Sequence, residues 1–252
     1  MRAKAALALL CLFFTLRLRA ADAPRFEAAS IRPTPDSVPF FGHMPSNGKF
    51  SGSGIVVRLM LMFAYDVQES QIADAPSWVG TDRWTVDANS EPGAHHTDDE
   101  TRQMLQNLLQ ERFGFRMHRE TREQSAYVLK IAKSGPKLKA SETGATNIRV
   151  NNNSIGLEHG EISRLTQLLA SALGKPVVDQ TGLTGHYNLS LQWNDAPVPD
   201  GGVIGLDAHA AADPNRESIF SAIQDQLGLQ LVSQRAPVEM IVIDKIERPS
   251  PN

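Results

Sequence analysis

The chain has 252 residues, 41% of them hydrophobic, and its 25 basic and 28 acidic side chains give a formal net charge of −3. This composition is typical of a soluble globular protein and argues against a collagen-like, a wholly disordered or a multi-span membrane protein. The near-neutral charge gives no electrostatic footprint for nucleic acid, so we expect no nucleic-acid partner. The length suits one large or two small domains, each with its own hydrophobic core.

Residues 1–23 have the three parts of a secretory signal peptide: a basic opening, an apolar run and small residues at 20–23. The apolar run is shorter than the about 20 residues that span a bilayer. We therefore expect cleavage near residues 20–23, a periplasmic or secreted mature protein, and no stable membrane anchor. An uncleaved N-terminal anchor is the alternative. Cleavage would also remove Cys11, the only cysteine, so the hydrophobic core alone would hold the mature fold together.

The segment 24–133 is predicted to be a first α+β repeat. Hydrophobic periodicity indicates a strand at 26–31, a helix within 55–65 and an alternating strand at 83–88. A second helix carries the apolar face of Leu105, Leu109 and Phe113, and Gly114 is expected to end it in a left-handed conformation. Two further strands are predicted after Gly114, the second of them at 127–131.

A second α+β repeat is predicted over 147–252, after a polar linker at 134–146 that is rich in helix and strand breakers. The segment 219–231 matches 105–117 without a gap, with Gly228 in the place of Gly114, and 241–245 then falls opposite 127–131. Upstream, a helix at 161–173 and a strand at 186–191 continue the correspondence. The sequence thus predicts tandem repeats of strand, helix, short strand, strand, helix, strand and strand, with helices packed on small mixed or antiparallel sheets. Two loops, 36–48 and 194–214, have no predicted role.

The most site-like cluster is His95-His96-Thr97-Asp98-Asp99-Glu100, since imidazoles and carboxylates can ligate a divalent metal. The favoured interpretation is structural. Thr97 and Glu100 have capping-box spacing, and acids in the first turn complement the helix dipole. Residues that are adjacent in the chain also rarely ligate the same metal ion.

His118 and Glu120 alternate on a predicted strand and should share a face, where a His–carboxylate pair can do acid–base chemistry. Nothing in the chain marks a nucleophile beside them, so a solvated face is the favoured interpretation. Asp207 and His209 lie in the second long loop without a rigid scaffold, and the glycines in 181–185 lack a dinucleotide fingerprint. The sequence therefore predicts no catalytic, cofactor-binding or metal-binding residue.

Several motifs in combination resemble a family of soil-associated bacterial exported proteins of unknown function, over essentially the whole mature chain. The residues that carry this resemblance are 26–33, 82–84, 108–114 with His118, 127–129, 135–139, 177–187, 226–229 and 243–250. The resemblance implies export and a shared α+β build. Similar domains also occur fused to membrane metallopeptidase sensors of the antibiotic-response type, which implies sensing or protein interaction, and the family provides no catalytic residues to carry over.

Two functions remain open on this basis. The favoured hypothesis is a non-catalytic extracytoplasmic module that binds a protein, a peptide or an envelope component. The alternative is a metal-assisted hydrolase that uses His95, His96 and Asp98, or His118. The positions of the histidines relative to a cleft distinguish the two, because a metal site needs ligands that converge on one point.

Overall fold

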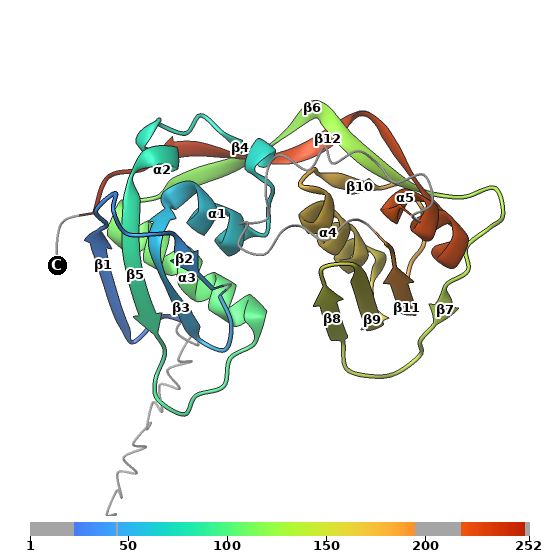
Figure 1. Cartoon of the computed structure of the whole chain (residues 1–252), viewed down its shortest axis with the longest axis horizontal. Helices are drawn as coiled ribbons and strands as arrows, with labels where there is room; N and C mark the ends of the chain where they lie inside the picture. The colour runs from blue at the N-terminus through green and yellow to red at the C-terminus, as the bar shows by residue number, and fades with distance from the viewer. Residues whose placement is uncertain (1–22, 44, 195–217, 250–252) are drawn as a thin grey trace, which may run out of the picture.

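The computed structural model describes residues 23–43, 45–194 and 218–249. They form three four-stranded sheets with helices packed against them, which confirms the α+β class. Two lobes lie side by side, and the two longest strands, β6 (Arg116–Ile131) and β12 (Leu229–Lys245), run across the top of both (Figure 1). The predicted signal peptide, except Ala23, and the loop 194–214, except Asn194, lie outside the described residues.

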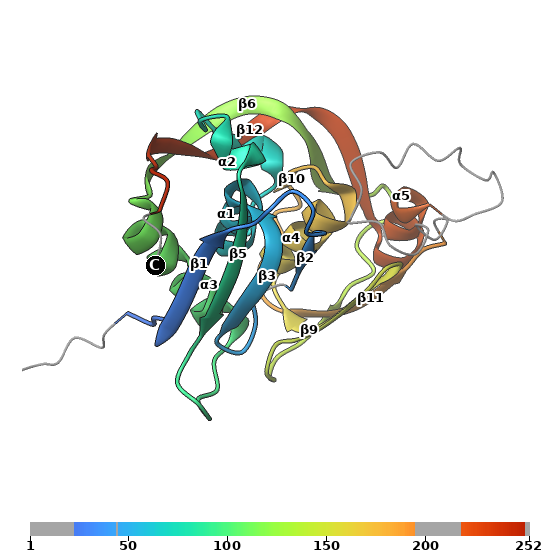
Figure 2. The same cartoon turned by 60° about the vertical axis from the view of Figure 1, so that its left-hand side comes forward.

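The first lobe is a four-stranded antiparallel sheet, in the order β1-β5-β3-β2, with α1 and α3 against one of its faces (Figure 2). Its strands are β1 (Ala28–Pro33), β2 (Phe41–Gly42), β3 (Lys49–Val56) and β5 (Arg83–Asn89). Its helices are α1 (Val57–Tyr65), α2 (Trp78–Thr81) and α3 (Asp98–Phe113), with a 3-10 turn η1 (Glu69–Gln71) and the short strand β4 (Ile72–Ala73) between α1 and α2. Leu109, Phe113 and Trp84 are buried between sheet and helices.

The second lobe has a sheet in the order β7-β11-β9-β8, so β8 is an outer strand. These strands are β7 (Lys139–Ala140), β8 (Asn147–Asn151), β9 (Ser154–Gly160) and β11 (Tyr187–Gln192). The helices are α4 (Ile162–Leu173), α5 (Ile219–Ala222) and a π-helix (Ile223–Leu227), and a short strand, β10 (Val177–Asp179), follows α4. Ile223 and Trp193 are buried in the core of this lobe.

The third sheet connects the lobes and has the order β10-β6-β12-β4. β6 and β12 are antiparallel over their whole length, with Leu229 opposite Ile131 and Lys245 opposite Arg116. The short strands at the two edges pair in parallel with a long strand from the other half of the sequence: Ile72 of β4 lies opposite Ile241, and Val177 of β10 lies opposite Tyr127. Each half of the sequence therefore contributes an edge strand that pairs with the long strand of the other half in the central sheet.

Two details of the predicted repeats need correction. β6 and β12 are each one continuous strand, where two strands were predicted. The middle of β6 is polar and mostly exposed, so it carries no hydrophobic alternation. Pro237 in β12, which lies opposite Glu123, has no N–H for a ladder, and the Arg235 guanidinium instead donates to the Glu123 carbonyl at 2.6 Å. The predicted linker also contributes a strand, β7, which pairs with β11. The division at 134–146 and the origin of the halves as copies of one unit stay predictions.

The predicted helix ends are confirmed. Gly114 and Gly228 have φ of 58° and 65° and follow α3 and the π-helix, and Gly174, with φ of 61°, follows α4. Leu109 and Ile223, at the centre of the two matched helical faces, are both 0% exposed. No helix in the described part of the chain is long and apolar enough to cross a membrane.

Candidate functional site between the lobes

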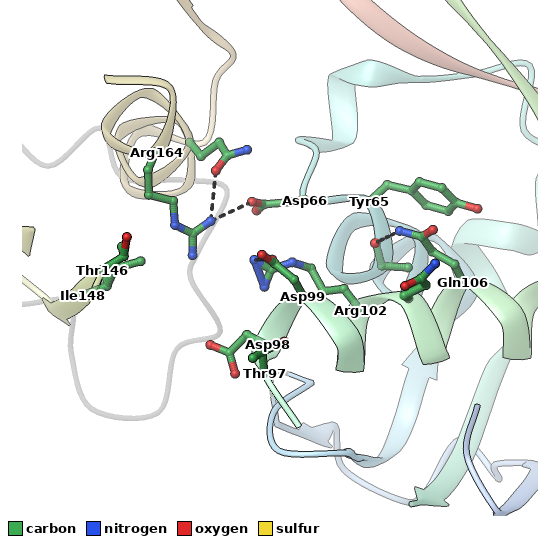
Figure 3. Close-up of a pocket in the computed structure, with 13 residues that line it drawn as sticks. Tyr65, Asp66, Thr97, Asp98, Asp99, Arg102, Gln106, Thr146, Ile148 and Arg164 are labelled. Atoms are coloured by element: carbon green, nitrogen blue, oxygen red, sulfur yellow. Dashed lines mark hydrogen bonds and ion pairs between the residues drawn. The ribbon is translucent and has the colours of Figure 1, made fainter. Parts of the chain in front are cut away.

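A polar pocket of about 580 Å³ lies between the two lobes. The first lobe contributes the end of α1 and the first half of α3, and the second lobe contributes α4 and the start of β8 (Figure 3). The lining includes three carboxylates, two guanidinium groups and three side-chain amides: Asp66, Asp98, Asp99, Arg102, Arg164, Gln103, Gln106 and Gln167. The first-lobe wall has charges of both signs and the second-lobe wall has the positive charge of Arg164, so the pocket can bind a ligand that is itself polar or charged.

The end of α1 and the start of α3 are fixed by local hydrogen bonds. Asp66 ends α1 in a left-handed conformation, with φ of 51°, and its N–H donates to Met62 O. Thr97 begins α3 with the predicted capping box, because its hydroxyl accepts from Glu100 N–H and the Glu100 carboxylate accepts from Thr97 N–H. The hydrogen bond from Thr97 N–H, together with one from the Thr97 hydroxyl to the same carboxylate, holds the pKa of Glu100 below its usual range. The Gln106 amide donates to the Ala64 carbonyl at 2.7 Å and so ties α3 to α1.

An ion pair joins the lobes across the pocket. Arg164 Nη1 of α4 lies 3.2 Å from Asp66 Oδ2 and also donates to Gln167 Oε1 at 2.9 Å (Figure 3). The two charged side chains are 26% and 29% exposed, so solvent screens the pair only in part. The pair therefore brings α4 and the end of α1 together while both groups remain open to the pocket.

The remaining charges of the pocket do not balance. Arg102 Nη2 pairs with Asp99 Oδ1 at 3.0 Å within α3. Within the described residues, the Asp98 carboxylate has no ion pair and no side-chain hydrogen bond, and Figure 3 shows it directed towards the wall formed by Thr146 and Ile148. The pocket thus carries one surplus negative charge at the start of α3.

Five of the described histidines, His95, His96, His118, His159 and His186, lie in three separate places. His95 is exposed, and His96 Nδ1 is 3.9 Å from Glu100 Oε2 beside the start of α3. His118 bridges two carboxylates on the central sheet, with its Nδ1 2.7 Å from Asp244 Oδ1 and its Nε2 3.8 Å from Glu120 Oε2. His118 and Glu120 therefore share a face, as the alternation predicted.

The third place is the stacked pair His159 and His186, which was not predicted. Their rings stack with centroids 4.2 Å apart, and Glu161 lies 3.8 Å from His186. Among the described residues, no group of three or more His, Cys, Asp or Glu side chains is placed to hold a metal ion. Of the residues named in the hydrolase alternative, only Asp98 lines the inter-lobe pocket.

The inter-lobe pocket itself was not predicted from the sequence. Its lining comes from four segments that are far apart in the chain, and its residue types are those that usually form solvated helix faces. The one signal that pointed to it was the cluster at 95–100, whose capping box was predicted correctly. Asp98 belongs to the first turn of α3 and also lines the pocket. The second role depends on how the lobes pack and could not be predicted from the local sequence.

The fold and the site together define a two-lobed α+β protein with a polar pocket between its lobes. The family model described as "Protein of unknown function (DUF3738)" matches residues 58–246, and the chain belongs to this family. No curated protein and no solved structure matches the chain. The matched region begins at α1 and ends just after β12, so it includes every element that lines the pocket.

Proposed function

We propose that the protein is an exported, non-catalytic binding module that takes a protein, peptide or envelope ligand into the pocket between its lobes. The inter-lobe pocket is the observation that carries this proposal. Both of its walls present charged groups that are already oriented by helix ends, by the Asp66–Arg164 pair and by the Gln106 hydrogen bond. Preorganised polar groups around a concave surface are what a binding site requires.

The connection between the lobes supports the same function. β6 and β12 cross from one lobe to the other as a two-stranded ribbon, and only the short strands β4 and β10 extend it at its edges. A ligand that contacts Arg164 of one lobe and Asp98 of the other would add interactions between the lobes to those of the ribbon and the Asp66–Arg164 pair. The resemblance to exported proteins and to sensor-fused domains supports an extracytoplasmic role.

Site-specific photo-crosslinking in the native host tests binding directly. A photoreactive amino acid at Gln103, an exposed position that lines the pocket, should give an adduct of defined mass. The matched control is the same amino acid at Lys133, which is exposed and is not among the residues that line the pocket. Adducts at both positions in equal amounts, or at neither, would contradict a ligand-binding pocket.

Export is tested on the same protein. N-terminal sequencing of material from a periplasmic or culture fraction should give a first residue between about Ala21 and Pro24. A retained Met1 in a cytosolic fraction would contradict export. Ligand binding in the pocket would then still be tested by the crosslinking experiment.

A further inference from the structure

We infer that the ligand of this pocket is an extended peptide that adds as a fifth strand to the free edge of β8 and places a basic side chain at Asp98. The inference rests on the proposed function, since it names the class of partner that the inter-lobe pocket takes. It is carried by the position of β8, by the chemistry of its two apolar residues and by the surplus charge on the opposite wall.

The outer edge of β8 has no partner strand in the described part of the chain. In its sheet β8 is the last strand, and in the described residues its backbone hydrogen-bonds to no element other than β9. Alternate residues of an outer antiparallel strand direct their N–H and C=O groups away from the neighbouring strand. Such an edge binds extended peptides through main-chain hydrogen bonds, while the flanking side chains determine which peptide fits.

The open side of β8 is part of the pocket. Ile148 of β8 and Thr146 just before it form the wall that faces the start of α3. An added strand lies about 4.8 Å from the strand it extends, so a peptide paired with β8 would occupy the inter-lobe pocket beside Asp98. The peptide would therefore pair with β8 and meet the Asp98 carboxylate in the same pocket.

The side chains of β8 define which residues the peptide presents. Ile148 lies opposite Leu157 and Val150 opposite Ile155, and both partners are buried, so Ile148 and Val150 share the core-facing side of the sheet. Val150 is nevertheless 54% exposed at the outer edge. A peptide residue beside it would bury apolar surface on both strands. The fitting peptide thus has an apolar residue beside Val150 on this face.

The charge of the pocket selects the sign of the flanking residue. Asp66 and Asp99 each have a guanidinium partner, whereas Asp98 has none in the described part of the chain. A Lys or Arg side chain of the peptide would complete this charge pattern, and an acidic side chain would oppose it.

The probe is the peptide acetyl-Thr-Lys-Thr-Val-Thr-Lys-Thr-amide, whose pattern is the same in either strand direction. Titrated into the exported protein, it should shift the amide NMR signals of β8 and of the start of α3, and protect the outward-facing β8 amides from hydrogen exchange. Two altered peptides are the controls. Glutamate in place of both lysines should abolish detectable binding, and N-methylation of alternate backbone nitrogens should weaken it about tenfold or more, because it removes main-chain donors.

Matched protein variants separate the contributions. Asp98→Asn should weaken peptide binding about fivefold, while Glu91→Gln, which removes an exposed carboxylate outside the residues that line the pocket, should leave it unchanged. Val150→Lys should weaken binding at least as much, since it removes apolar surface and adds a positive charge that repels the lysines of the peptide. Ile131→Lys, at a 40% exposed site on β6, is its control.

The results that overturn the inference are distinct from those that overturn the proposed function. Equal binding of the N-methylated peptide, or crosslinks from position 150 to residues 195–217 of the same chain, would exclude a peptide strand on β8 and leave pocket binding intact. No binding of any peptide would also overturn the inference, and the crosslinking at Gln103 would then still report whether the pocket holds another kind of ligand.

Discussion

The two lobes follow a similar succession of elements but differ in the helix that leads into the long central strand. In the first lobe this helix, α3, has 16 residues, whereas in the second lobe α5 has 4 residues and continues as a five-residue π-helix. Both end at a left-handed glycine and pass directly into β6 or β12. The junction between helix and strand is therefore common to the two lobes, and the start of the helix is what differs.

The difference at the helix start determines where the pocket is. α3, capped by Thr97, carries Asp98, Asp99 and Arg102 into the inter-lobe space, whereas α5 lies on the far side of its own lobe (Figure 1). The second lobe reaches the pocket with α4 and β8 instead. The two lobes thus supply different elements to the site, and a similar order of elements need not give two equivalent sites.

The largest expected effect comes from the cores. Leu109→Ala and Ile223→Ala should each lower the free energy of unfolding by about 2–5 kcal/mol, because both side chains are fully buried. Since β6 and β12 run through both lobes, either variant should destabilise both lobes in one transition. Chemical unfolding followed by lobe-resolved hydrogen exchange measures this. Loss of protection in only the lobe that carries the substitution would show that the lobes unfold independently.

The shared helix ends predict an unequal response to one substitution. Alanine in a left-handed conformation costs about 1–2 kcal/mol, and this strain applies at Gly114, Gly174 and Gly228 alike. At Gly228 the new Cβ would also overlap the Gly135 carbonyl oxygen and lie 2.9 Å from Lys137 N, both of them backbone atoms. Gly228→Ala should therefore lower the melting temperature clearly more than Gly114→Ala.

Gly174→Ala is the matched control for this comparison, because its Cβ would meet nothing within 4 Å and only the backbone strain remains. At Gly114 the nearest atom is Glu247 Oε2 at 3.4 Å, at the end of a flexible side chain. Equal losses at all three positions would mean that the 135–137 segment moves away from Gly228 at little cost.

The sequence predicted what depends on local chemistry and missed what depends on pairing across the chain. Gly114 and Gly228 were recognisable because a glycine after the last apolar residue of a helix has a local reason to be there. The continuity of β12 was not recognisable, since Pro237 indicates a break and the hydrogen bond from Arg235 to the Glu123 carbonyl that compensates for it depends on the pairing with β6. Trp193, just after β11, is 5% exposed because its core partners come from other segments of the chain.

The next comparison is between the N-cap residues of α3 and α5, Thr97 and Ser218. Thr97→Ala should lower the free energy of unfolding by about 1 kcal/mol, since the Thr97 hydroxyl accepts the Glu100 N–H at 3.2 Å. Ser218→Ala removes a similar hydrogen bond, to Ser221 N–H at 3.3 Å, but should cost less because burial of Ile219, Ala222 and Ile223 holds this short helix in place. Thermal unfolding measures both, and Thr97→Ser is the control that retains the cap. A larger loss at Ser218 would reverse the expected order.

A smaller effect is the pH dependence that the capping box adds to the first lobe. The pKa of Glu100 lies below its usual value of 4.5, chiefly because the carboxylate accepts the hydrogen bond from Thr97 N–H. Its stabilisation should be fully present above about pH 4.5 and should be lost as the pH falls through the lower pKa of the folded state. The difference in unfolding free energy between the wild type and Glu100→Gln should therefore shrink below pH 4.5. A constant difference down to pH 3 would contradict this linkage.

The smallest expected effect concerns His95 and His96, which lie beside the same helix start. His95 is exposed, and His96 meets Glu100 at 3.9 Å, so replacing both with alanine should change the free energy of unfolding by less than about 1 kcal/mol. Melting curves with chelator and with added zinc test this, because a metal that binds the folded state raises the melting temperature. We expect the wild type and the double variant to melt alike in both conditions. A zinc-dependent rise that disappears in the double variant would place a metal at the start of α3, beside Asp98 and the pocket, and would favour a metal-assisted hydrolase over a binding module.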